Sequence, residues 1–367
     1  MGKHEDASDF IIQLSNGFYL SGGCENNLIL YDNLFIEKMR INDLNDWVFK
    51  SFEKVSNKKF DKNLTLFCCI NKELRLFFLD KENLTMNMQN YEIKNKTWKN
   101  CIEMNENNFI IFGLGGASYF INLLKGNNQG IEYIITTKTY KGGIKINDKA
   151  VALTSNSILS EGEDKLIIYN IESKKISNTI EGYSFTISIN NLTLIPMENL
   201  KKENKILLCA CKKYSKNQKN GILLVNLDLS DNKRIENEFF ETDNFEVYCF
   251  CPILLIGNKN KNHGIINEEY KKKINIKDTD FFFVGGFDID KREGQIKLFK
   301  IHYGKNIWKT TIEFIQHIEF DDVKNFEDFD GSISCVIQSK ITGHILATCY
   351  NGNVYSFTPP NIEYYYN

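Results

Sequence analysis

Apolar and polar residues alternate over short stretches along most of this chain, and turn-forming residues separate the stretches. In the clearest example, residues 18–32, two alternating segments flank a turn rich in Gly, Asn and Glu. Residues two apart in an extended chain point to the same side, so this pattern predicts half-buried β-strands joined as hairpins. Long amphipathic helices are not indicated. The sequence therefore predicts an all-β protein.

The strand-turn-strand unit recurs, and each copy ends in a large apolar residue followed by a polar one. Steps between the first copies are close to the ~40 to 45 residues of a four-stranded propeller blade. Later steps are longer because polar stretches are added, above all 258–280. The seven copies end at Tyr31-Asp32, Leu79-Asp80, Ile121-Asn122, Tyr169-Asn170, Val225-Asn226, Phe299-Lys300 and Phe357-Thr358.

Turns between the paired strands carry residues that accept a positive φ angle. Examples are Asn16-Gly17, Asn220-Gly221 and Asn351-Gly352-Asn353, each of which we expect at a hairpin tip. The run Asp288 to Gly294 has the composition of a charged hairpin tip.

Together these features predict a single β-propeller domain over residues 1–367, with seven blades of four antiparallel strands. A domain boundary near residue 258 is the alternative, but the strands after it repeat the same hairpin pattern, so one continuous ring is simpler. The predicted blades span 9–41, 47–94, 99–140, 142–184, 185–240, 245–320 with an insertion at 258–280, and 331–367.

Ring closure requires a fourth strand for the last blade, because an unpaired strand would leave an exposed edge. Two segments are candidates for that strand, residues 362–366 and the amino-terminal segment. The sequence leaves both open.

Segments 28–32 (Leu-Ile-Leu-Tyr-Asp) and 162–170 (Gly-Glu-Asp-Lys-Leu-Ile-Ile-Tyr-Asn) resemble the turn Asp and the terminal aromatic-Asp pair of WD repeats. The resemblance extends over nearly the whole chain, but no copy has the literal Trp-Asp ending or a clean Gly-His start, so the repeats are degenerate. Gly-Gly pairs at 22–23, 115–116 and 285–286 also resemble kelch repeats, which rank second because the kelch Tyr and Trp are missing. The WD resemblance implies a rigid disc whose faces and channel bind peptides or proteins, and it implies no reaction.

Charge and cysteine content narrow the classes of partner and the cellular location that we expect. The 45 basic and 47 acidic residues give a formal net charge of −2, so no overall field directs the chain toward nucleic acid or an anionic membrane. The ten cysteines lie mainly in apolar runs such as 66–70, which predicts reduced, buried thiols. We find no signal peptide and no run of the ~18 to 20 apolar residues that a membrane span needs. We expect a cytoplasmic protein, with the nucleus as second choice.

Motifs for chemistry are weak throughout. The five histidines are scattered without metal-ligand spacing, and Gly113 to Gly116 lead into a strand instead of a nucleotide-binding helix. Carboxylates at 321–322 and 327–330 are typical of a solvated acidic loop. We therefore expect no catalytic residues, no cofactor and no metal.

The function expected from this sequence is a non-enzymatic scaffold that binds protein partners through the propeller faces and loops. One alternative is a hydrolase or lyase with its active site at the mouth of the channel. Another is an RNA-associated or ribosome-associated propeller that uses the Lys- and Asn-rich stretches 212–220 and 258–273. Membrane, nucleic-acid and small-molecule ligands are not expected.

Overall fold

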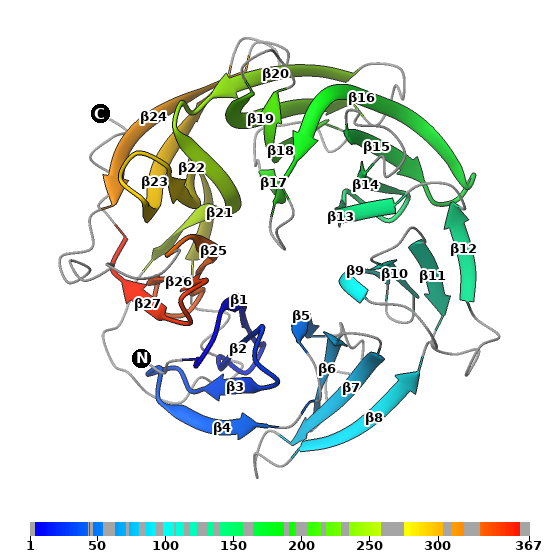
Figure 1. Ribbon diagram of the computed structural model, residues 1–367, viewed down its shortest axis with the longest axis vertical. Coiled ribbons are helices and arrows are strands. Elements are labelled where there is room, and N and C mark those ends of the chain that lie inside the picture. The colour runs from blue at the N-terminus through cyan, green and yellow to red at the C-terminus, as the bar shows by residue number, and fades with distance from the viewer. Residues whose placement is uncertain are drawn as a thin grey trace.

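Strands arranged radially around a central opening make up the protein, shown as a computed structural model in Figure 1. The structure describes residues 4–42, 44, 47–53, 63–70, 73–80, 86–92, 98–105, 108–113, 118–122, 131–135, 139–156, 164–186, 191–195, 204–213, 218–228, 235–257, 275–303, 310–318 and 331–359. All regular elements in these ranges are β-strands, as the alternating pattern predicts.

Four of the sheets contain four antiparallel strands each, paired in chain order. In Figure 1 the first strand of each lies nearest the opening and the fourth lies at the periphery. These sheets are β1 (Ser8–Gln13), β2 (Tyr19–Gly23), β3 (Leu28–Tyr31) and β4 (Glu37–Ile41); β5 (Val48–Glu53), β6 (Asn63–Ile70), β7 (Glu73–Asp80) and β8 (Met86–Glu92); β9 (Trp98–Asn105), β10 (Asn108–Gly113), β11 (Ser118–Asn122) and β12 (Ile131–Ile135); and β21 (Phe245–Gly257), β22 (Asn275–Asp288), β23 (Glu293–His302) and β24 (Thr311–Ile318).

Two further sheets complete the described part of the ring. One has eight strands: β13 (Thr139–Lys145), β14 (Ala150–Asn156), β15 (Asp164–Asn170), β16 (Lys175–Phe185), β17 (Leu192–Ile195), β18 (Asn204–Lys213), β19 (Lys219–Asp228) and β20 (Ile235–Glu241). The other has three: β25 (Ile333–Gln338), β26 (Ile345–Cys349) and β27 (Val354–Phe357).

The eight-stranded sheet exists because β16 pairs on both sides. Most of β16 pairs with β15, but its last residues, Tyr183 to Phe185, pair with Lys213 to Cys211 of β18. The predicted blade boundary at 184–185 therefore falls inside a continuous strand. The boundary predicted at 140–142 likewise falls inside β13, where Gly142 pairs with Thr154.

Several predicted turns are correct and others are not. Gly17 and Gly352 lie in turns with φ angles of 92° and 80°, and residues 289–292 form the tip between β22 and β23. Asn220 and Gly221, expected at a tip, lie instead inside β19, where they pair with residues of β18.

The insertion expected at 258–280 ends earlier than predicted. β22 begins at Asn275, and its first residues pair with the end of β21. Alternation in the sequence Ile274-Asn275-Ile276-Lys277 is the signal for this extension, and the lysines nearby obscured it. Residues 258–274 lie outside the described ranges.

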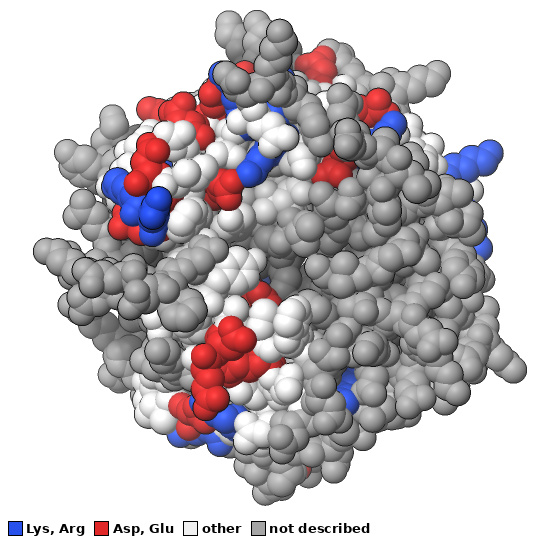
Figure 2. Space-filling model, in the orientation of Figure 1, with Lys and Arg blue, Asp and Glu red and all other residues white. Residues whose placement is uncertain are grey.

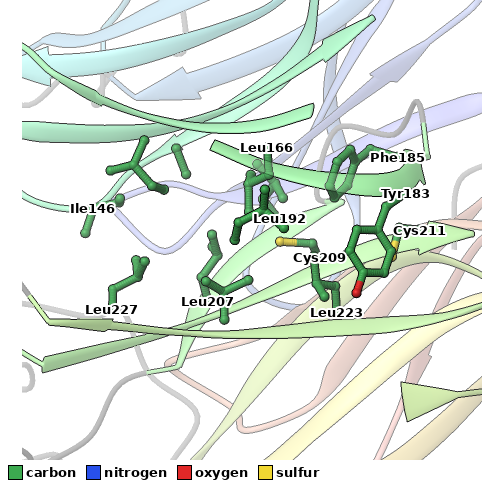
Figure 3. Packing of buried hydrophobic residues seen from close by; sticks show 14 of the residues in the cluster. Ile146, Leu166, Tyr183, Phe185, Leu192, Leu207, Cys209, Cys211, Leu223 and Leu227 are labelled. Atoms are coloured by element: carbon green, nitrogen blue, oxygen red, sulfur yellow. The ribbon is translucent and has the colours of Figure 1, made fainter. Parts of the chain in front are cut away.

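Hydrophobic side chains fill the spaces between neighbouring sheets and between the two halves of the eight-stranded sheet. Figure 3 shows one such layer, in which residues of β14 to β16 face residues of β18 and β19. The eight cysteines whose side chains are described form no disulfide, and every one except Cys24 is buried, as predicted for reduced thiols. In Figure 3 the labelled members of the hydrophobic layer between β14–β16 and β18–β19 are Ile146, Leu166, Tyr183, Phe185, Leu192, Leu207, Cys209, Cys211, Leu223 and Leu227.

The ring closes where β1 to β3 meet β25 to β27. His4 N donates a hydrogen bond to Gly352 O (3.0 Å), and Ser334 Oγ donates to Ser8 O (2.5 Å). Because β1 is the inner strand of its own sheet, the described amino-terminal residues do not supply a fourth strand to the β25–β27 sheet. The other candidate, 362–366, lies outside the described residues.

Candidate interaction face

One face of the ring, which we call the upper face, is formed by the turns between second and third strands and by the connections from one sheet to the next. Its described segments are 4–7, 24–27, 42, 44, 47, 186, 191, 218, 242–244, 289–292, 331–332 and 350–353. Figure 2 shows acidic side chains gathered over the β1–β4 sheet beside the central opening, and charges of both signs over the sheets that contain β18 to β24.

Inner strands carry a β-bulge near their upper ends. In β1, for example, Ser8 pairs with Gly23 and Phe10 with Gly22, so Asp9 is the extra residue of the register. A bulge leaves the extra residue outside the hydrogen-bonded ladder. The extra residues are Asp9 in β1, Phe49 in β5, Lys99 in β9, Lys141 in β13, Tyr248 in β21 and Ser334 in β25.

Glycine pairs face two of these bulges. Gly23 lies opposite the bulge at Asp9, and a Cβ there would lie 2.0 Å from Ala7 O. Gly286 lies opposite Tyr248, and a Cβ there would lie 2.0 Å from Glu246 O. Gly22-Gly23 and Gly285-Gly286 are therefore strand residues that allow the bulged backbone to approach closely, and not turn residues.

A buried polar network fixes the upper end of the β1–β4 sheet. His4 Nε2 lies 2.8 Å from Ser21 Oγ, and His4 Nδ1 lies 3.2 Å from Glu25 Oε2. Ser21 Oγ in turn lies 3.5 Å from the hydroxyl of Tyr31. Burial lowers the pKa of His4, although the nearby Glu25 carboxylate acts in the opposite direction.

His4 was missed by sequence reasoning, which treated the histidines as scattered. It precedes Tyr31-Asp32 in an order that resembles the Gly-His start and Trp-Asp end of a WD repeat, although Lys3 stands where the Gly would be. The separation along the sequence between His4 and Tyr31-Asp32 is the signal that could have identified His4 as part of the repeat.

Acidic side chains at equivalent turns hold the connections between sheets. Asp164 Oδ2 accepts hydrogen bonds from Phe185 N (2.8 Å) and Ser184 Oγ (3.2 Å). Glu25 Oε1 accepts one from Asp6 N in the same way. These carboxylates order the upper face and are structural.

Two tyrosines, a carboxylate and a thiol lie on the upper face at the mouth of the channel. The rings of Tyr248 and Tyr350 meet edge to face at 6.2 Å, and Cys24 Sγ lies 3.8 Å from Asp9 Oδ2. Burial raises the pKa of Tyr350, and burial together with Asp9 raises the pKa of Cys24 to about 12. The thiol is therefore protonated at neutral pH and is not a reactive nucleophile.

A pocket of about 180 Å³ opens where the end of β16, the β18–β19 hairpin and the start of β21 meet. We call it the junction pocket. Its lining residues are Ser184, Phe185, Thr186, Cys211, Lys212, Asn220, Glu246, Val247 and Tyr248.

The polar side of the junction pocket is an ordered carboxylate. Glu246 accepts a hydrogen bond from Tyr248 OH (2.8 Å) and pairs with the ammonium of Lys212. Burial alone would raise the pKa of Glu246, but the hydrogen bonds from Lys212 and Tyr248 outweigh it, and the net pKa lies below the ordinary value. Glu246 is thus ionised at neutral pH.

The remaining candidate residues do not converge on a site. Gly113 ends β10, while residues 114–116 and the acidic residues 321–322 and 327–330 lie outside the described ranges. Exposed His302 pairs with Glu313 on the neighbouring strand. Within the described ranges no three His, Cys, Asp or Glu side chains group as metal ligands, and no helix is long and apolar enough to cross a membrane.

Comparison with solved structures identifies the fold. The chain resembles the crystal structure of the β-propeller domain of Myceliophteria thermophila Cps50 (Swd1), with a TM-score of 0.59 and 8% sequence identity over 98% of each chain. No protein-family model and no curated protein sequence matches the chain. The protein has the β-propeller fold that the repeat pattern predicted.

Proposed function

We propose that this protein is a non-enzymatic interaction scaffold whose partner protein binds the upper face. The described strands fit the proposed seven blades if the eight-stranded sheet is counted as two blades. A rigid ring loses little conformational entropy on binding, and the residues it presents at bulges and turns set specificity.

The observation that carries this proposal is the preformed junction pocket beside the Tyr248–Tyr350 pair on the upper face. Tyrosines at the centre of a surface, next to an ordered carboxylate, are typical of binding hot spots. The segment before β1 adds the exposed acidic residues Glu5 and Asp6 on the same face. Nothing comparable in the described residues favours an active site, because the mouth thiol is protonated.

Affinity capture from cells of the source organism, with quantitative mass spectrometry, tests the proposal. Tyr248→Ala should reduce the amount of partner recovered at least about fivefold, a loss of the size typical of an aromatic hot spot. Leu34→Ser is the matched control, because Leu34 is 59% exposed and lies in the turn between β3 and β4 at the opposite face. Loss of the partner with Leu34→Ser but not with Tyr248→Ala would overturn the proposed site. Turnover of a substrate by the purified chain, with no captured partner, would overturn the function.

A cytoplasmic location belongs to the same proposal, and imaging of the tagged protein in its own cells tests it.

A further inference from the structure

We propose that the junction pocket binds one cationic side chain, an arginine, from an extended segment of the partner protein. This inference rests on the proposed function and names the chemistry of the partner at that site.

The size of the pocket sets the class of ligand. Small-molecule and cofactor sites usually enclose ~300 to 1,000 Å³, whereas this pocket has about 180 Å³. A space of that size accommodates one long side chain. Phe185, Cys211 and Val247 form an apolar wall, which suits the methylene stem of such a side chain.

The charge at the polar end favours a cation. Glu246 is ionised, only 21% of its side chain is exposed, and Tyr248 OH orients one carboxylate oxygen at 2.8 Å. A carboxylate that is partly desolvated and fixed in place forms strong, charge-assisted hydrogen bonds with a cationic donor. An incoming carboxylate would instead meet Glu246 as a like charge.

Lys212 is the cation that holds this position now, and it can be displaced. Its side chain is 38% exposed, and its long flexible stem can move the ammonium into water. Guanidinium presents a planar fork that binds both carboxylate oxygens, whereas an ammonium acts as a single point charge. Arginine is therefore a better partner for Glu246 than the resident lysine.

Neighbouring lysines do not compete for Glu246. Lys219 Nζ lies 2.6 Å from Glu241 Oε2, and Lys213 Nζ lies 5.7 Å from the centre of the Phe239 ring. The pocket thus has one ionised carboxylate and one displaceable cation among its lining residues.

Methyl NMR of the full chain, observing the Val247 methyl groups, tests the inference directly because Val247 lines the pocket. The probes are N-acetylarginine N-methylamide, the uncharged citrulline analogue of the same shape, and the glutamate analogue, each titrated to tens of millimolar. We expect saturable shifts of Val247 with the arginine probe only. Glu246→Gln should weaken that binding about tenfold, because it removes the charge and keeps the shape. Lys212→Met should strengthen it several-fold, because it removes the competing cation.

The inference predicts that Glu246→Gln lowers the affinity for the arginine probe and that Lys212→Met raises it. These opposite changes distinguish the inference from its alternatives. Binding of the glutamate probe, lost in Lys212→Met, would show an anion site and overturn the inference. Equal arginine binding in wild type and Glu246→Gln, or no shift of Val247 with any probe, would also overturn it. Unchanged Val354 methyl signals, on β27 away from the pocket, confirm that both variants fold.

Failure of this inference can be told apart from failure of the proposed function. If the partner is captured in a Tyr248-dependent manner while the pocket ignores the arginine probe, the scaffold role stands and the arginine site does not. If the arginine probe binds and no partner is captured, the arginine site stands and the scaffold role does not.

Discussion

The hydroxyl groups of Tyr19 and Ser339 are hydrogen-bonded at 2.6 Å, although 320 residues separate them in the chain. Tyr19 belongs to β2 and Ser339 follows β25, so the bond joins the first sheet to the last described sheet. Ile11, Tyr19 and Tyr31 pack there against Cys335 and other buried residues of the last sheet. The ring is thus closed by specific contacts and not only by the overall shape of the sheets.

Tyr19→Phe should destabilise the protein by about 1 kcal/mol, the usual net value of one buried hydrogen bond. Urea denaturation monitored by tryptophan fluorescence measures the change. Tyr355→Phe is the matched control, because its hydroxyl accepts a local hydrogen bond from Asn353 Nδ2 within the same hairpin. Hydrogen exchange of β1 and β25 should accelerate in Tyr19→Phe and not in Tyr355→Phe. Equal exchange in both would contradict a closing role for the Tyr19–Ser339 bond.

The stability of the protein should depend on His4 between about pH 5 and 7. Burial lowers the pKa of His4 in the folded state below its ordinary value of 6.5. The unfolded chain therefore binds more protons at this position, and the free energy of unfolding falls as the pH decreases through 6.5. Above that pH the contribution is fully present.

Urea denaturation of wild type and His4→Gln at pH 7.5 and pH 5.5 measures this dependence. The difference between the two proteins should shrink at the lower pH, since Gln does not titrate. An unchanged difference at both pH values would show that the His4 network does not titrate with folding.

Asp32 should contribute to stability through the turn that it caps. Its Oδ1 accepts hydrogen bonds from Leu34 N and Ile36 N, both at 2.9 Å, and Oδ2 lies 2.9 Å from Lys38 Nζ. Asp32→Ala should cost about 1 to 3 kcal/mol because it leaves backbone donors unpaired. Asp32→Asn should cost less, since an amide oxygen can still accept from the turn.

The contribution of Asp32 to the free energy of unfolding should depend on pH, because folding lowers the pKa of this carboxyl group. Burial would raise the pKa, but hydrogen bonds from Ile36 N, Lys38 and Leu34 N outweigh burial and hold it below 3.8. The carboxylate therefore stabilises the fold above about pH 4, and this contribution is lost as the pH falls through the lowered pKa. Denaturation of Asp32→Asn, which has no ionisable group there, should lack this part of the acid response. An acid response identical to wild type would contradict it.

Two glycine substitutions should differ in cost. Gly23→Ala places a methyl group 2.0 Å from the backbone oxygen of Ala7, and the bulge in β1 must shift to accept it. Gly285→Ala meets side chains instead, Cys249 Sγ at 2.7 Å and Ile333 Cγ2 at 2.6 Å. Both variants should be destabilised by about 1 to 3 kcal/mol or more, with Gly23→Ala the worse.

A second substitution tests whether the cost of Gly285→Ala comes from contact with the side chain of Cys249. Cys249→Ala combined with Gly285→Ala should be less destabilised than the sum of the single changes, because the smaller side chain makes room. Denaturation of the single and double variants measures the coupling. Additive effects would show that the methyl group at Gly285 does not meet Cys249 as the structure places it.

Strands were predictable from sequence because alternation and turn residues act locally. Strands β4 and β16 follow the copies that end at Tyr31-Asp32 and Tyr169-Asn170, as a four-stranded blade predicts, and the turn at Gly352 is where its neighbours indicate. Asn220-Gly221 failed as a turn because the same residues fit a strand when the partner strand continues to Lys213. At these two residues, hydrogen-bonded pairing with β18 outweighs the local propensity for a turn.

The candidate site was largely hidden from sequence reasoning for a different reason. A β-bulge at Asp9 or Tyr248 is defined by the register against another strand, which composition does not encode. The junction pocket combines Phe185, Lys212 and Glu246 from three separate segments, so no local motif marks it. Only the Gly-Gly pairs gave a local signal, and they were interpreted as turns.

Hydrogen–deuterium exchange of the complex with its captured partner tests the central claim most directly. The account predicts that partner binding slows exchange in the upper-face segments 242–248 and 350–353. Exchange should be unchanged in segments 14–18 and 339–344, which connect first to second strands on the opposite face. Protection confined to the opposite face, or equal exchange in the free and bound protein, would contradict the account.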